Sequence, residues 1–446
     1  MNRLLLPTML ALALPAHAQN ALEGIWQSDG YGLLAEIENG RARTFQIAGD
    51  TCLPIDGWQR LSRTLEGIEV SLAADGNTVY LTAPHAQHRI MVHRLPTLPQ
   101  ACSSPLPDTP IGNFEAFAAI FAHSYAFFDT YGVDWAATVR DARPRVTPQM
   151  SDEALFRLFV EMIARLPDGH LELEGRIGRQ EVSFEPNPGR THLALMAQGD
   201  REDAVDAFHE AFWRGSVAQT VLGGEGEMTL NRRMQYGLIG DDVGYIALVT
   251  MGDFSWRGVD ADRDLSAVNA AMEEALQSFA QAGVRAVIVD ASVNYGGFDF
   301  VSRAVASRFA EAPVHAYTKY AGDAVAPIRT EVHLTPAQGA RFTGPVYLLT
   351  SNITISAGEI LTLAMGSLPN VTHVGEPTRG AFSDVLDRVL PNGWEVSLSN
   401  EVYEDVQGRV WEGRGITPDV ALTVFPDANP VAGHRDAINA ILAMID

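Results

Sequence analysis

The sequence predicts an α+β multidomain protein in which a small all-β domain, a helical block and an α/β domain follow one another. The chain has 446 residues, 46% of them hydrophobic, which is enough for two or three domains. Short alternating apolar runs separated by Asp-Gly and Asn-Gly turns dominate residues 22–100. Apolar residues at helical spacing follow, and buried-type strands alternating with helices begin near residue 244.

Residues 1–18 have the pattern of a secretory signal peptide. An arginine at position 3 precedes an apolar run over residues 4–14, and Ala-His-Ala at 16–18 fits an A-x-A cleavage site. The run is shorter than the ~20 residues that span a bilayer. We therefore expect an exported bacterial protein, periplasmic or secreted, without stable membrane insertion.

Residues 19–103 are predicted to form the small all-β domain. The chain's two cysteines, Cys52 and Cys102, both lie in this region. In an oxidising compartment an isolated pair of cysteines usually forms one bridge, so we expect a Cys52–Cys102 disulfide. Residues 104–111 are rich in proline and are typical of a linker.

Residues 112–175 are predicted to form the helical block. Aromatic residues recur at helical spacing over 114–128, and Ser151 begins a second helix with its apolar stripe over 155–163. A Pro-Asp-Gly-His turn at 167–170 ends that helix. This turn places His170 at the start of a short strand.

Residues 176–242 are predicted to be an irregular connecting region with one helix around 203–214. The α/β domain then occupies 243–446, because its apolar runs have the continuous character of strands buried on both faces. The predicted strands cover residues 245–249, 284–289, 346–350 and 371–374. Pro-Asn-Gly at 391–393 predicts a hairpin turn between two alternating strands.

The charge balance excludes some classes of partner. Acidic residues outnumber basic residues 55 to 32, and the formal net charge is −23. Nucleic acids and anionic membranes are therefore poor partners.

Ser356 lies where a predicted buried strand joins a helix, in the sequence Ser-Ala-Gly-Glu at 356–359. Backbone N–H groups at the positive end of a helix dipole can stabilise the oxyanion of an acyl-transfer intermediate. The same four residues also fit a capping box, in which the serine only caps the helix. The local sequence leaves a nucleophile and a cap both open.

Four further motifs accompany Ser356 along the chain. They are Asp-Gly-His at 168–170, Asn-x-Gly-Gly at 294–297, Gly-Glu-Pro-Thr at 375–378 and Gly-Ile-x-Pro-Asp at 415–419. In this order and spacing the five motifs resemble the core of the S41 peptidases (tail-specific proteases) over roughly 112–175 and 243–425. The resemblance implies a ClpP/crotonase-like α/β catalytic core and identifies Ser356 as the nucleophile.

The resemblance also suggests the general base. One branch of the family uses a Ser/Lys dyad, but the corresponding position here is Ala381, and the single lysine, Lys319, lies in an expected surface segment. The branch similar to the tricorn core and the retinoid-binding-protein-like members uses histidine and glutamate. It implies His170 as general base and Glu412 as the orienting carboxylate.

Two details complete the site that the resemblance implies. The tricorn-like arrangement has a serine before its histidine, whereas this chain has Gly169, so Glu412 would reach His170 directly or through water. The oxyanion hole would consist of the backbone N–H groups of Gly297 (or Gly296) and Ala357. Residues 176–242 are too few for a PDZ domain, so recognition of C-terminal tails is not assumed.

Other polar groups suggest less chemistry. The histidines at 85, 88 and 93 have no partner at zinc-ligand spacing. The aspartates at 260, 262 and 264 lack the glycine and the final glutamate of a calcium loop and fit the start of a helix. Arg379 suits either a substrate carboxylate or a surface salt bridge. No metal and no organic cofactor is implied.

These features predict a serine-type peptidase that hydrolyses unfolded or short exported polypeptides through an acyl-enzyme. Its partner would be the peptide or protein substrate, and an oligomer is neither required nor excluded. One alternative is a catalytically inactive S41-fold protein that binds a ligand or acts as a scaffold. Another is an esterase-like hydrolase, which the absence of Gly-x-Ser-x-Gly around Ser356 disfavours.

Overall fold

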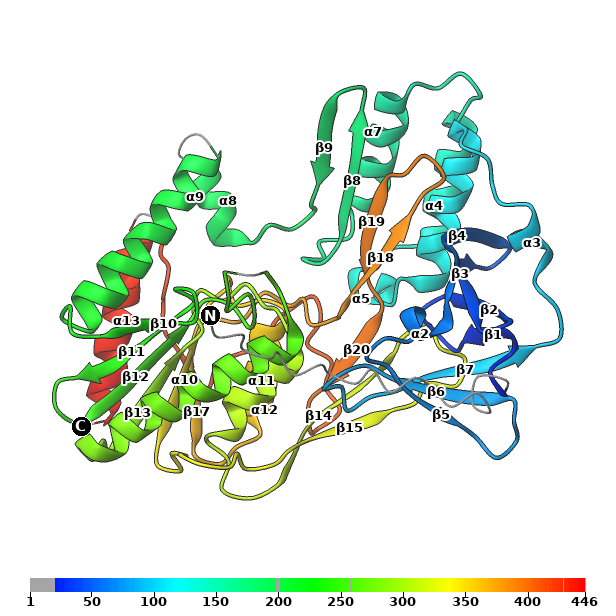
Figure 1. The fold of residues 1–446 in the computed structure, drawn as a ribbon. Coiled ribbons are helices and arrows are strands. Elements are labelled where there is room, and N and C mark those ends of the chain that lie inside the picture. Colours follow the sequence, from blue (N-terminus) through cyan, green and yellow to red (C-terminus); the bar gives the residue numbers. More distant parts are fainter. Residues whose placement is uncertain (1–20, 198–200, 257, 428, 446) are drawn as a thin grey trace, which may run out of the picture.

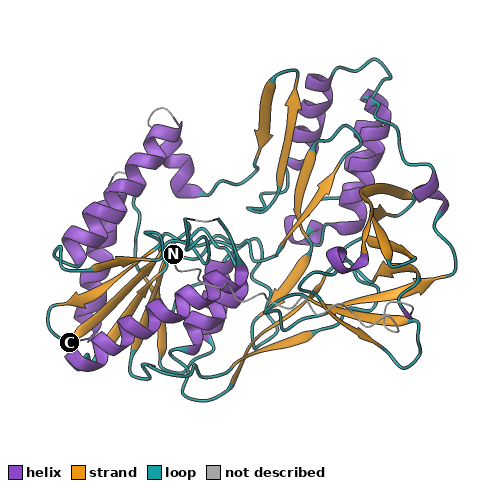
Figure 2. Cartoon of the chain, in the orientation of Figure 1, coloured by secondary structure: helices purple, strands orange, loops and turns teal. Residues whose placement is uncertain are grey.

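A computed structural model describes residues 21–197, 201–256, 258–427 and 429–445, so the signal peptide predicted for residues 1–18 lies outside the described residues. The α/β domain occupies one end of the molecule, and the helical block stands above the N-terminal sheet at the other end (Figures 1 and 2). In the described part of the chain no helix combines the length and apolarity needed to cross a membrane. The predicted α+β multidomain class is confirmed.

The N-terminal domain is one antiparallel sheet of seven strands in the order β4-β3-β2-β1-β7-β6-β5. The strands are β1 (Gly24–Ser28), β2 (Leu33–Glu38), β3 (Arg41–Ala48), β4 (Thr51–Arg60), β5 (Glu69–Leu72), β6 (Thr78–Thr82) and β7 (Ile90–Leu95). Two short helices, α2 (Leu61–Thr64) and α3 (Gln100–Ser103), flank them. The expected disulfide joins Cys52 in β4 to Cys102 in α3.

The helical block forms because aromatic residues at helical spacing pack against one another. It contains α4 (Pro110–Ser124), α5 (Phe128–Tyr131), α6 (Trp135–Ala142), the 3-10 turn η1 (Arg143–Arg145) and α7 (Asp152–Ile163). Thr109 and Ser151 cap α4 and α7 by accepting a backbone N–H each. Phe117 of α4 stacks on Phe159 of α7 with ring centroids 4.0 Å apart, which fixes the two long helices together.

A four-stranded sheet connects this block to the C-terminal half of the chain. Its order is β18-β19-β8-β9, built from β8 (Glu172–Ile177), β9 (Gln180–Phe184), β18 (Val385–Val389) and β19 (Glu395–Ser399). The predicted hairpin over 385–398 is therefore the partner of the strand that follows His170. Leu173, Val396 and Leu398 join Phe159 in one buried cluster, so the two halves share a core.

The α/β domain is a seven-stranded sheet in the order β10-β11-β12-β13-β16-β17-β21. Its strands are β10 (Glu227–Thr229), β11 (Met234–Ile239), β12 (Val243–Leu248), β13 (Ala286–Asp290), β16 (Val346–Thr350), β17 (Val371–Gly375) and β21 (Val420–Ala421). From β12 to β21 every neighbouring pair is parallel. A smaller antiparallel sheet joins β14 (Val314–Ala321) to β15 (Thr330–Leu334) and β20 (Glu401–Glu404).

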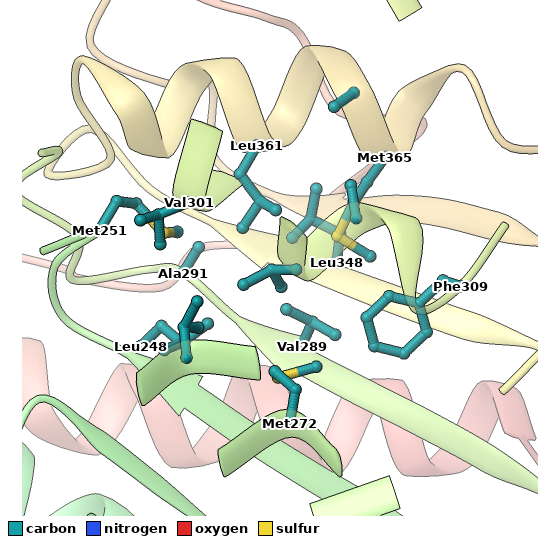
Figure 3. Packing of buried hydrophobic residues seen from close by; sticks show 14 of the residues in the cluster. Leu248, Met251, Met272, Val289, Ala291, Val301, Phe309, Leu348, Leu361 and Met365 are labelled. Carbon is teal, nitrogen blue, oxygen red and sulfur yellow. The ribbon is translucent and has the colours of Figure 1, made fainter. Parts of the chain in front are cut away.

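Helices cover both faces of the parallel sheet, which explains why its strands are apolar throughout. Val289 of β13 faces α10 (Ala261–Ala282), α11 (Asp299–Ser307) and α12 (Ala357–Gly366), and Figure 3 shows this side of the core. Ile288, the preceding residue, faces the π-helix η2 (Ala211–Val221) and α13 (Pro430–Ile445). The carboxyl ends of the parallel strands therefore emerge between two helical layers.

The region 176–242 is more regular than the sequence predicts. Besides β9, it contains α8 (Arg190–Met196), α9 (Arg201–Glu210), η2, β10 and β11. The helix expected around 203–214 continues well past its predicted end, but α-helical bonding stops at Glu210 and i→i+5 bonding follows. A π-helix does not produce the 3.6-residue period on which the prediction relied.

Lys319, which we expected at the surface, is buried in β14 with 1% exposure. Its ammonium lies 2.6 Å from a carboxylate oxygen of Asp384 and 2.7 Å from one of Glu401. The Tyr31 hydroxyl of the N-terminal domain donates to Glu401 at 2.6 Å. A buried charge needs such partners, and here they connect the N-terminal domain to the centre of the molecule.

We predict that Phe159→Ala lowers the free energy of unfolding by about 3–5 kcal/mol, because it removes a fully buried ring from the stack with Phe117. Urea unfolding followed by circular dichroism measures the change. The control is Val325→Ala, at a side chain 95% exposed, which should change the free energy by less than about 0.5 kcal/mol. Equal unfolding midpoints for both variants would contradict the packing described here.

Candidate active site

Ser356 occupies the N-cap of α12 in a backbone conformation that few non-glycine residues adopt, with φ 58° and ψ −127°. Its side chain makes no capping hydrogen bond, so the capping box considered above is not formed. The Ser356 N–H donates to the carbonyl of Ala381 at 2.9 Å. The partly exposed hydroxyl is thus left free for a ligand.

Glu359, the fourth residue of Ser-Ala-Gly-Glu, bonds to a distant loop instead of the helix start. Its carboxylate is buried and accepts the N–H groups of Gly380 and Ala381, both at 2.7 Å. Burial raises the pKa of Glu359 to about 7, although these hydrogen bonds oppose the shift. Sequence reasoning missed this role because the i,i+3 spacing from Ser356 already had a local explanation.

The Gly-Gly turn after β13 lies directly against the nucleophile. A Cβ added to Gly296 would come 2.5 Å from the Ser356 Cβ, 2.9 Å from its Oγ and 3.2 Å from the Ala357 nitrogen. Gly296 and Gly297 have φ values of 78° and 136°, which favour glycine. Within the described residues, neither the Gly297 N–H nor the Ala357 N–H has an acceptor. Two donors without an acceptor, on the residues that follow Gly296 and Ser356, therefore flank the contact between Gly296 and the Ser356 side chain.

His170 lies in a turn that packs on the segment carrying Ser356. A Cβ added to Gly169 would lie 3.1 Å from Ile355 and 3.2 Å from Ala381. Asp168, which is fully buried, holds the turn: it accepts the His170 N–H at 2.9 Å, the Tyr125 hydroxyl at 2.8 Å and the Ser399 hydroxyl at 3.1 Å. The sequence placed Asp168 in the Asp-Gly-His motif but did not predict these contacts.

The electrostatics around His170 favour the neutral imidazole. Burial is the largest effect and lowers the pKa of His170, and nearby Arg379 acts in the same direction. The carboxylates of Asp168 and Asp384 oppose it. A neutral imidazole can accept a proton.

Glu412 is buried and faces the same loop as Glu359. One of its oxygens accepts the N–H groups of Phe382 at 2.9 Å and Ser383 at 3.3 Å. Burial raises the pKa of Glu412 well above its ordinary value, and the nearby charge of Asp168 adds to the effect. Glu412 therefore has a structural function that sequence reasoning did not predict.

The three predicted site residues lie in one region without forming a hydrogen-bonded chain. In the described residues no hydrogen bond joins Ser356 to His170 or His170 to Glu412. His170 Nδ1 and Glu412 Oε1 are both buried and without a partner. Each of these two atoms would gain from an additional hydrogen bond, because an unpaired buried polar atom is costly.

The histidines and aspartates that were considered as possible metal ligands make helix-capping or ion-pair contacts within the protein. Asp260 caps α10 by accepting the Arg263 N–H at 2.8 Å. His85 pairs with Asp262 at 2.7 Å, and His88 is half-buried with its Nε2 3.7 Å from a carboxylate oxygen of Glu401. In the described residues no group of three or more histidine, cysteine or carboxylate side chains is placed to hold one metal ion.

Arg379 is largely covered by its neighbours instead of lying on the outer surface. Its Nε donates to the Asn352 carbonyl at 2.7 Å, and the negative charges of Glu359 and Glu185 partly offset the lowering of its pKa by burial. The guanidinium lines a hollow that also includes Ile355 and Tyr295. It therefore stands beside the Ser356 segment rather than on the outer surface.

A second serine, histidine and aspartate lie in contact elsewhere. Ser216 and His434 are 2.8 Å apart, and His434 lies 2.7 Å from Asp290. All three side chains are buried, with exposures of 2%, 0% and 2%. A substrate has no access to this chain of hydrogen bonds, which instead ties η2 and α13 to the end of β13.

We predict that the stability difference between wild type and Glu359→Gln depends on pH. Between pH 4.5 and about 7 the unfolded chain ionises this carboxyl while the folded protein keeps its proton, so wild-type stability declines as pH rises. The difference should shrink by on the order of 3 kcal/mol across this window. Urea unfolding at several pH values measures it, and parallel curves for the two proteins would contradict the raised pKa.

The chain is similar to known proteins both in sequence and in fold. The family model described as peptidase family S41 matches residues 242–422. A solved protein from Parabacteroides merdae ATCC 43184 superposes with a TM-score of 0.59 and 24% identity, covering 76% of this chain and 97% of that one. Mature CPAF complexed with lactacystin gives a TM-score of 0.54 and 12% identity, covering 76% and 98%. At these identities the structural likeness shows the fold alone, and the family match shows that residues 242–422 of this chain are similar to peptidase family S41.

Proposed function

We propose that this protein is a serine-type peptidase that cleaves unfolded or short polypeptides after export, through an acyl-enzyme on Ser356. The observation that carries the proposal is the strained N-cap of α12. There Gly296 packs against the Ser356 side chain, and the N–H groups of the residues that follow these two, Gly297 and Ala357, have no acceptor in the described chain. Strain of this kind is typical of positions where a fold holds a group ready for chemistry.

In the proposed reaction His170 acts first as a general base and then as a general acid, in both acylation and deacylation. Ser356 Oγ attacks the carbonyl carbon of the scissile peptide bond while His170 accepts the hydroxyl proton. The N–H groups of Gly297 and Ala357 stabilise the oxyanion. His170 then gives the proton to the leaving amine, and the peptide C–N bond breaks. Next, a water oxygen attacks the acyl carbon while His170 takes its proton, and His170 returns that proton to Ser356 Oγ as the acyl–oxygen bond breaks and the acid leaves.

Glu412 is proposed to orient His170 once the substrate is bound. His170 Nδ1 and Glu412 Oε1 each lack a partner, so a hydrogen bond between them, direct or through water, would satisfy both. Such catalytic contacts are often long in a free enzyme and shorten in its substrate complex. Glu412 Oε2 remains on Phe382 and Ser383 throughout.

The Ser/Lys alternative has no support in this geometry. Lys319 is paired with two carboxylates, and the charges of Asp384 and Glu401 raise its pKa well above the ordinary value despite burial. A permanently charged ammonium cannot accept the serine proton. At the position where that branch carries its lysine, Ala381 contributes its backbone to Ser356 and Glu359.

One observation favours the alternative of a catalytically inactive S41-fold binding protein. Ser356, His170 and Glu412 form no hydrogen bond to one another in the part of the chain that the structure describes. If these three side chains do not form hydrogen bonds to one another when a polypeptide binds, the hollow lined by Arg379 and Ile355 would hold the polypeptide without cleaving it.

A fluorophosphonate probe separates the two functions. We predict that wild-type protein is labelled on Ser356 and cleaves a casein-like unfolded substrate, whereas Ser356→Ala and His170→Ala lose roughly 10³-fold or more of both activities. Gly296→Ala should lose labelling as well, because its Cβ would displace the Ser356 side chain. Labelling kinetics and cleavage assays measure the effects.

The matched control is Ser367→Ala at the opposite end of α12, where the hydroxyl bonds only to the Ala364 carbonyl at 2.7 Å. It should label and cleave as wild type does. Wild-type protein that is folded but neither labels nor cleaves would favour the binding protein, and labelling with turnover of esters only would favour an esterase.

A further inference from the structure

A second hollow is lined by Val293 and Tyr295, which precede the Gly-Gly turn. Its volume is about 670 Å³, within the range of sites that enclose organic ligands. Its lining includes Phe212, Trp213, Asn231, Val249, Val293 and Tyr295. Because Tyr295 is bonded directly to Gly296, a polypeptide seated at Ser356 has this hollow as its neighbour.

One wall of the hollow is a strained backbone segment. Leu230, Asn231 and Arg232 are three consecutive non-glycine residues with positive φ, at 52°, 52° and 65°. Single residues adopt this conformation at a cost, and runs of them are rare. An ion pair between Arg233 and Asp253 at 2.6 Å holds the segment, and Asp253 also has a positive φ of 58°.

The same walls carry polar atoms that lack partners. The Trp213 indole N–H and the Asn231 side-chain oxygen are buried and make no hydrogen bond. One is a donor and the other an acceptor. A peptide group supplies one acceptor and one donor, so a polypeptide segment is the ligand class that complements this pair.

The side chains around the hollow favour a large apolar ligand over a charged one. Asp206, Glu210 and Arg232 at its edge have mixed signs, and Arg233 is already paired. The apolar surface is largely aromatic, and Trp256 at the rim is 81% exposed. Aromatic walls favour large apolar guests.

Tyr295 is fixed as the boundary between this hollow and the one lined by Arg379. Its hydroxyl lies 3.0 Å from His192 Nε2 of α8 and also contacts His209 Nε2 of α9. Burial lowers the pKa of His209, which keeps this contact between neutral groups. The helices of the region 176–242 therefore shape the hollow next to the proposed nucleophile.

We propose that this hollow is a specificity site that binds one large apolar, preferably aromatic, side chain of the polypeptide substrate together with its adjoining peptide group. The site is built from η2, the strained segment at 230–232 and Tyr295. The inference rests on the proposed peptidase function, because the bound side chain is taken to belong to a substrate. The binding itself does not require catalysis.

The test uses Ser356→Ala full-length protein, so that peptides bind without being cleaved. Two fluorescein-labelled, alanine-rich peptides are compared by anisotropy, one with a single central phenylalanine and one with alanine there. We expect the phenylalanine peptide to bind about tenfold more tightly. Adding Asn231→Gly or Trp256→Ala should reduce this preference to about twofold or less.

Asn231→Gly and Trp256→Ala are chosen so that a loss of the preference for phenylalanine is not explained by misfolding. Glycine adopts φ 52° without strain, so Asn231→Gly should melt no lower than its parent, and Trp256 is a surface residue. Val325→Ala, an exposed apolar residue far from the site, should keep the full preference.

Equal affinity for both peptides, or a preference that survives both variants, would overturn the proposal. The phenylalanine peptide could bind tenfold more tightly although the wild-type protein is not labelled by fluorophosphonate. That result would support the specificity site and contradict the peptidase function.

Discussion

Two buried carboxylates hold four consecutive backbone N–H groups, and the rest of the site depends on this arrangement. Glu359 accepts from Gly380 and Ala381, and Glu412 accepts from Phe382 and Ser383. The loop between these glutamates is therefore fixed, and its Ala381 carbonyl accepts the Ser356 N–H. The strained backbone of Ser356 persists because partners on both sides hold it. A buried carboxylate without such donors would be costly.

The same loop leads into the strands that position the histidine. It continues into the β18–β19 hairpin, and β19 pairs with β8 directly after His170. Asp168 reaches back to Ser399 at the end of β19. Lys319 binds Asp384 at the end of the loop and Glu401 beyond the hairpin, where the N-terminal domain also attaches. The site is thus assembled from segments far apart in sequence, which share one hydrogen-bond network.

The sequence predicted those elements that are determined by residues close to one another in the chain. Apolar periodicity and turn residues indicated the α/β domain and the hairpin, and motif order indicated the loops around Ser356. Long-range partners left no local signal: Lys319 looked like a surface residue because Asp384 and Glu401 are distant in sequence. Glu359 looked like half of a capping box for the same reason. The π-helix η2 escaped prediction because its period is not that of an α-helix. Asp168 and Glu412 acquire their hydrogen-bonding roles only in the folded chain.

The central claim is that Ser356, held by this loop, presents its hydroxyl to a carbonyl polarised by Gly297 and Ala357. A crystal structure of the protein after reaction with a fluorophosphonate tests it most directly. We expect phosphorus bonded to Ser356 Oγ, the phosphonyl oxygen within hydrogen-bond distance of both N–H groups, and His170 in contact with the adduct. The Gly380–Ser383 loop should remain on Glu359 and Glu412. Phosphorus on another residue, or a phosphonyl oxygen pointing away from both N–H groups into solvent, would contradict the account.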